Sequence, residues 1–184
     1  MPTNLSLRGK ESLSTENIIA ILMRHENSSP LITLDLYQTS LGSRSTKDLT
    51  ALCAALPLPL KHLILSYNQF GKNPSTGLAQ ALRAIKAKLE TLRLAYNDLD
   101  ELSLAEWIKI LEAMPNTVIT LDLAFSIYKS EPQDEKADAK HTRLEECKKI
   151  LTKIEPKDSH AIQLETNIKQ DQTNIAQMPL LKII

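Results

Sequence analysis

Two neighbouring stretches of the chain decide its fold: Leu60-Lys-His-Leu-Ile-Leu-Ser-Tyr-Asn-Gln-Phe-Gly71 and Leu89-Glu-Thr-Leu-Arg-Leu-Ala-Tyr-Asn-Asp-Leu99. The second stretch repeats the pattern of the first 29 positions later, from residue 60 to residue 89. When this period is extended over the chain, two columns contain only leucine. The columns are Leu5, Leu34, Leu63, Leu92 and Leu121, and Leu7, Leu36, Leu65, Leu94 and Leu123. A fixed period of this length is the signature of a solenoid, in which each copy forms one structural turn.

Each copy predicts a strand followed by a turn. Leucines at i and i+2 point to the same side of an extended strand, so each pair forms one inward face. The turn contains Asn68 and Asn97 in the two best copies, where a buried amide satisfies backbone groups that would otherwise lack partners. The same position is Thr39, Ser126 or Lys10 in the other copies. Lysine cannot take that buried role, so we expect an irregular first repeat.

A helix is predicted after each turn. Apolar residues recur at i, i+3, i+4 and i+7 over residues 49–56, 78–85 and 107–114. The segment Ser103-Leu-Ala-Glu106 predicts a capping box at the start of the last of these helices. Same-direction strands joined by helices give a parallel sheet on the concave side of the solenoid and helices on its convex side.

At these residues the sequence resembles the leucine-rich-repeat family, whose pattern is LxxLxLxxNxL, over about residues 2–128. The repeat length is similar to that of the ribonuclease-inhibitor subclass. The resemblance implies an α/β solenoid of about five 29-residue β-α repeats. It also implies a function in binding another protein, since ribonuclease inhibitor holds an enzyme in its horseshoe. The degenerate repeats, low glycine content and short C-terminal extension are similar to leucine-rich-repeat effectors of intracellular bacterial pathogens.

The end of the repeat pattern at Tyr128 divides the chain into three parts. Residues 1–128 are the predicted solenoid, and residues 129–136 are a polar connector that contains a proline. Residues 137–184 predict an α-helical hairpin with an apolar tail. The hairpin has two interpretations: a cap over the exposed end of the solenoid, or a helical module with its own partner.

Composition and charge argue against several classes of function. Lysine plus arginine equals aspartate plus glutamate, 22 each, so no net charge recruits nucleic acid or an anionic membrane. The early apolar run of residues 18–23 is too short for a signal-peptide core or a membrane span. Of the two cysteines, Cys147 is remote and Cys53 falls in an apolar helical stretch, which favours a reducing compartment over a disulfide. We expect a cytoplasmic monomer, or one secreted into a host cytosol by a signal-peptide-independent route.

Catalytic and metal-binding motifs do not occur in the sequence. It has no nucleophile elbow, P-loop, HExxH or CxxC sequence, and four glycines cannot build a phosphate cradle. No pair of histidines, and no histidine with a cysteine, has metal-ligand spacing among His25, His62, His141 and His160. We therefore expect a protein that is not an enzyme and that needs no cofactor or metal.

The residues beside the paired leucines face out of the predicted concave sheet, so we expect them to form a binding surface. One column places Tyr67, Tyr96 and Phe125 on successive strands, about 4.8 Å apart. These aromatics are either hot spots for a partner or rings that pack on each other at the rim. The repeat itself does not require an exposed tyrosine or isoleucine at positions 37 and 64. The predicted protein-binding residues are Asp35, Tyr37, His62, Ile64, Tyr67, Arg93, Tyr96, Asp122 and Phe125.

The leading hypothesis is a non-catalytic protein-binding module that uses the concave face and inhibits a partner enzyme. A first alternative is a translocated bacterial effector that binds a host protein or restrains another effector. A second alternative is a structural assembly protein that acts through the C-terminal helices.

Overall fold

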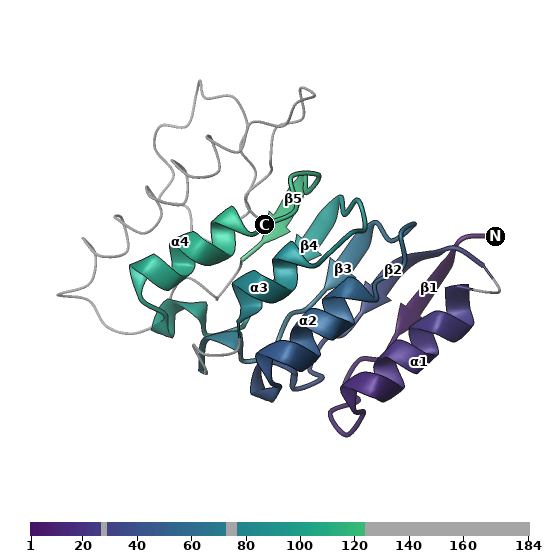
Figure 1. Cartoon of the computed structure of the whole chain (residues 1–184), viewed down its shortest axis with the longest axis horizontal. Helices are drawn as coiled ribbons and strands as arrows, with labels where there is room; N and C mark the ends of the chain where they lie inside the picture. The colour runs from purple at the N-terminus through teal and green to yellow at the C-terminus, as the bar shows by residue number, and fades with distance from the viewer. Residues whose placement is uncertain (27–28, 73–76, 124–184) are drawn as a thin grey trace, which may run out of the picture.

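The computed structural model describes residues 1–26, 29–72 and 77–123, which form a two-layer α/β unit (Figure 1). In these residues, five parallel strands form one sheet in the order β1-β2-β3-β4-β5. The strands are β1 (Thr3–Ser6), β2 (Leu31–Asp35), β3 (His62–Ile64), β4 (Thr91–Arg93) and β5 (Thr120–Asp122). The helices on one face of this sheet are α1 (Thr15–Glu26), α2 (Thr46–Ala54), α3 (Leu78–Arg83) and α4 (Leu104–Glu112).

The strand register confirms the 29-residue period. Leu34, Leu63, Leu92 and Leu121 are direct partners across β2 to β5. Pairing between β1 and β2 contains a shift, which confirms that the first repeat is irregular. The predicted connector at 129–136 and the predicted hairpin at 137–184 lie outside the described residues.

The core lies between the two layers. Leu34, Leu63 and Leu92 are 0–1% exposed, and Trp107 on α4 is 2% exposed. The capping box of α4 is confirmed, with Ser103 and Glu106 each bonded to the other's backbone amide.

Each of the three predicted helices runs two residues past the end of the observed one, since α2 ends at Ala54, α3 at Arg83 and α4 at Glu112. At α3, apolar spacing extends the predicted helix to Ile85. After Arg83 the amides of Ala84 and Ile85 donate to carbonyls three residues back, at Ala81 and Leu82. This tighter 3₁₀ pattern ends the helix and leads the chain back to the sheet.

Buried amide side chains link successive turns of the solenoid. The Oδ1 atom of Asn68 accepts hydrogen bonds from the backbone amides of Thr39 and Leu41, both at 3.0 Å. Its Nδ2 group donates to the carbonyls of Leu36, at 2.8 Å, and Leu65, at 2.9 Å. One turn later, the Oδ1 atom of Asn97 accepts from the Asn68 amide at 2.7 Å. The predicted role of the two asparagines is therefore confirmed.

Cys53 packs as a small buried hydrophobe on α2, as predicted, and is 7% exposed. Burial raises the pKa of its thiol to about 12. In a Cys147→Ser variant, we expect Cys53 to resist a thiol reagent at about pH 8, because the reactive form is the thiolate. Labelling should appear only when urea unfolds the protein, as measured by mass spectrometry. Fast labelling of the native protein would contradict this burial.

Candidate protein-binding surface

The sheet face opposite the four helices carries four of the nine predicted binding residues. We call it the open face and define it by Thr33, Asp35, His62, Ile64, Thr91 and Arg93. The strand register places Asp35, Ile64 and Arg93 side by side across β2, β3 and β4. Asp35 and Ile64 are half-buried, whereas Arg93 is exposed. The open face therefore presents an acidic, an apolar and a basic side chain in one row.

The charged groups of this row differ in whether they already have hydrogen-bond or ion-pair partners within the protein. The Oδ1 atom of Asp35 accepts from the Tyr37 amide at 2.9 Å, and its Oδ2 atom accepts from the Ser6 hydroxyl at 3.4 Å. Arg93 has no ion-pair partner among the described residues. Asp122 continues the row on β5, but it is only 9% exposed, so it is buried and not accessible to a partner as expected. Arg93 is thus the charge of this row that remains available to a partner.

A stack of tyrosines lies beyond the ends of β2, β3 and β4. The ring centroids of Tyr37 and Tyr67 are 4.7 Å apart with a tilt of 43°, and those of Tyr67 and Tyr96 are 4.3 Å apart and stacked. The guanidinium carbon of Arg8 lies 3.8 Å from the Tyr37 ring centroid, a cation–π contact. We call these four residues, Arg8, Tyr37, Tyr67 and Tyr96, the tyrosine stack.

The turn backbone places the rings on one another. Tyr67 and Tyr96 have φ angles of 60° and 56°, and Gln38, one repeat earlier, has 52°. A left-handed conformation costs a residue with a β-carbon about 1–2 kcal/mol. It is held at Tyr67 by the backbone hydrogen bond from its amide to the Ala95 carbonyl at 3.0 Å. Because the same conformation recurs at one repeat spacing, equivalent side chains leave the turns in the same direction.

The rings of the tyrosine stack bury part of their surface against one another and leave the rest exposed to solvent. Packing of rings on each other is confirmed, yet Tyr67 and Tyr96 are 39% and 37% exposed. Partial desolvation, followed by the neighbouring Tyr37 and Tyr96 phenols, raises the pKa of Tyr67. The hot-spot role of the column remains a prediction.

One part of the predicted surface is buried, and another part lies outside the described residues. Ser66 and Ala95, which follow the paired leucines and were expected to face outward, are 6% and 5% exposed. Phe125 lies outside the described residues.

The sequence prediction did not include Arg8 as a site residue. The available signal was its position, since Arg8 occupies the same place in its repeat as Tyr37 in the next. An arginine one turn before an exposed tyrosine is within reach of a cation–π contact.

In the part of the chain that the structure describes, no group of three histidine, cysteine, aspartate or glutamate side chains is arranged to hold a metal ion. No helix within these residues has the length and apolar character needed to cross a membrane.

Comparison with known proteins adds one match. No family model matches the sequence, and no curated protein matches it. Among solved structures, the chain is similar to the crystal structure of the leucine-rich repeat-containing protein LegL7 from Legionella pneumophila, with a TM-score of 0.54 and 25% identity. The match covers 84% of this chain and 53% of that chain, so this chain spans about half the length of LegL7. The similarity supports a leucine-rich-repeat fold, and this fold suggests a protein-interaction module.

Proposed function

We propose that this chain is a non-catalytic module that binds a partner protein through its open face and the adjoining tyrosine stack. The observation that carries the proposal is the stack itself. Three rings and a guanidinium are held in fixed contact, and two of the rings keep more than a third of their surface exposed. Rings that are already ordered lose little conformational entropy when a partner covers them.

The size of the surface fits a protein partner. A tyrosine buries about 150–250 Å² when fully covered, and a standard interface buries about 800 Å² on each partner. The partly exposed rings supply a fraction of this area, so the strand residues must contribute the rest. Ile64 and Arg93 provide an apolar contact and a cation in the adjoining row. A surface made of these few side chains matches a compact partner or one protruding loop.

We further propose that the bound partner is an enzyme and that binding covers its active site. This proposal rests on the resemblance of the repeat length to the ribonuclease-inhibitor subclass, whose founding member blocks an enzyme in this way. It is an analogy between folds, and the chemistry of the surface adds only that the partner carries a group complementary to Arg93.

A second candidate is a translocated bacterial effector that binds a host protein or restrains another effector. The similarity to a Legionella pneumophila leucine-rich-repeat protein favours this candidate. Both candidates use the same surface, so one set of variants tests the binding step in either.

The test replaces Tyr37 and Tyr67 of the tyrosine stack and Arg93 of the open face with alanine in one protein. The Tyr67 position already has a β-carbon at positive φ, so alanine adds no new type of backbone strain. A partner identified by affinity capture is then titrated with both proteins. Loss of two or three hot-spot residues, each costing about 2 kcal/mol or more, should weaken binding at least about 100-fold.

The matched control carries three alanines on the helix layer, at Lys47, Gln80 and Glu112, which are all exposed. It should bind as tightly as the natural sequence. Unchanged affinity of the Tyr37/Tyr67/Arg93 variant for its partner would reject the proposal.

A further inference from the structure

Charge is unevenly distributed along the chain, although the whole protein is neutral. Residues 49–89 contain no aspartate or glutamate. The same segment contains the cations Lys61, Lys72, Arg83, Lys86 and Lys88. The overall balance of charge therefore says little about the middle repeats.

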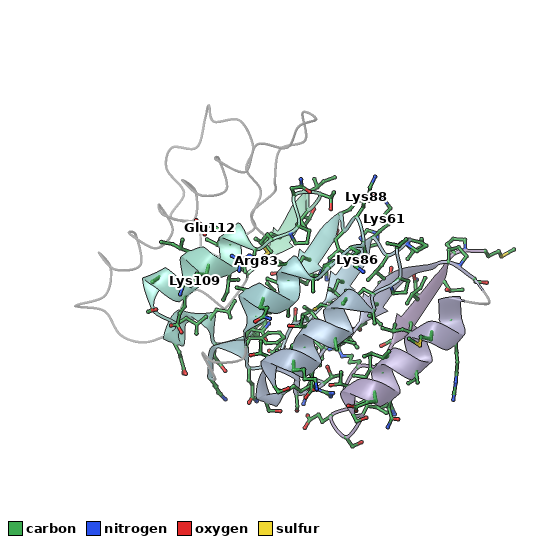
Figure 2. The ribbon with its side chains drawn as sticks, viewed as in Figure 1. Lys61, Arg83, Lys86, Lys88, Lys109 and Glu112 are labelled. Atoms are coloured by element: carbon green, nitrogen blue, oxygen red, sulfur yellow. The ribbon has the colours of Figure 1, made fainter. Side chains whose placement is uncertain are left out.

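The fold gathers most of these cations in one region. Arg83 ends α3, Lys86 and Lys88 lie in the segment that leads to β4, and Lys61 immediately precedes β3 (Figure 2). The backbone amides of Glu90 and Thr91 both donate to the Lys61 carbonyl, which fixes the two segments side by side. We call Lys61, Arg83, Lys86 and Lys88 the basic patch. Lys109 flanks it on α4 (Figure 2).

The basic patch keeps most of its charge unpaired. Lys61 forms an ion pair of 2.7 Å with Glu90 and lowers the pKa of that carboxyl group. Arg83, Lys86 and Lys88 are exposed and have no ion-pair partner among the described residues. A helix dipole accounts for a cation in the last turn of a helix, as at Arg83. It does not account for Lys86 and Lys88, which lie beyond the end of α3.

An exposed leucine lies three residues before Lys61 in the chain. Leu58 is 66% exposed between Pro57 and Pro59, in the segment that leads to β3. Its position is one repeat before Ala87, which separates Lys86 from Lys88. The two segments enter neighbouring strands with His62 and Thr91 in register. The patch therefore combines several cations with one exposed apolar side chain.

We propose that the basic patch is a second binding surface, separate from the open face, for a short acidic segment of a partner protein that carries one apolar side chain. The unpaired cations of the patch would bind the acidic side chains of this segment. The exposed side chain of Leu58 would contact its apolar side chain. A membrane is a poorer match, because Glu90 and Glu112 offset two of the five cations that the patch and Lys109 supply, which leaves a net charge of only three. Polybasic membrane anchors need dense clusters of about 4–8 basic residues.

The experiment measures binding of a fluorescent peptide, Glu-Asp-Glu-Leu-Glu-Asp-Glu, by anisotropy with the full-length chain. A control peptide replaces every acid with its amide. We expect the acidic peptide alone to bind, and its affinity to fall when salt rises from about 50 to about 300 mM, because exposed charge pairs are screened. A double variant, Lys86→Glu with Lys88→Glu, should weaken binding at least tenfold, and Leu58→Ser should weaken it severalfold.

The matched control changes the same charge elsewhere, with Lys10→Glu and Lys47→Glu at two exposed lysines. It should bind within twofold of the natural sequence, as should the Tyr37/Tyr67/Arg93 variant. Three results would overturn the proposal: unchanged binding by the Lys86/Lys88 variant, equal weakening by the control, or binding to vesicles with about 30% phosphatidylserine and not to the peptide. Circular dichroism confirms that each variant is folded.

Discussion

Replacing Asn68 with alanine is expected to lower the free energy of unfolding by about 4 kcal/mol, because two buried amides then lose their acceptor at a cost of about 1–3 kcal/mol each. These amides belong to Thr39 and Leu41, and both donate to Asn68 Oδ1 in the natural protein. The carbonyls of Leu36 and Leu65 lose a donor at the same time. A small domain is stable by only about 5–15 kcal/mol, so this loss is a large part of the total.

Urea denaturation followed by circular dichroism measures the change in unfolding free energy. The matched control is Gln80→Ala, which removes an exposed side-chain amide on α3 and should change stability by less than about 0.5 kcal/mol. Near-UV circular dichroism gives a second readout, since Asn68 directly follows Tyr67 and holds the turn that positions the tyrosine stack. If Asn68→Ala unfolds within about 1 kcal/mol of the natural protein, the amide links are not a main source of stability.

The repeat made most of the fold predictable. Leucine at i and i+2 in every copy leaves one way to form an inward face, so the strands and their register follow from the period. The asparagine position followed from the need to satisfy the backbone at a buried turn. The end of α3 was less predictable, because Ile85 fits the helical spacing while its amide belongs to a 3₁₀ turn. Periodicity records which side of an element is apolar, and it does not record where the hydrogen-bond pattern changes.

The repeat columns predicted which residues form the candidate site, but they did not predict the contacts and backbone angles of these residues. Spacing placed Tyr67 and Tyr96 in one column, and the structure shows that they are stacked. Neither the positive φ of these residues nor the contact of Arg8 with Tyr37 follows from the spacing. Both depend on the left-handed turn, which residues with a β-carbon adopt only when the surrounding structure requires it. Here the hydrogen bonds between turns provide that requirement.

The close approach of successive turns leads to the second large effect. The amide of Gly71 donates to the Asn97 carbonyl at 2.8 Å, and Gly42 makes the equivalent bond to Asn68 at 2.9 Å. A β-carbon on Gly71 would collide with the backbone carbonyl of Asp98. Backbone atoms cannot move aside as a flexible side chain can, so Gly71→Ala must separate the two turns. We expect a loss of about 3 kcal/mol or more in unfolding free energy, at the upper end for overpacking.

Gly9→Ala is the control that distinguishes the effect of this collision from the effect of backbone strain alone. Gly9 has a φ of 69° with no atom within 4 Å of its added β-carbon, so alanine there meets strain without a clash. Its cost should be about 1 kcal/mol. Gly71→Ala should also weaken the near-UV signal of the tyrosine stack, because the carbonyl that Gly71 contacts belongs to Asn97, the neighbour of Tyr96. Equal losses for the two variants in urea denaturation would show that the spacing between turns is not set by Gly71. The rings stack only as closely as the backbone turns beneath them, so the geometry of the tyrosine stack would then be set by contacts other than the approach of Gly71 to the next turn.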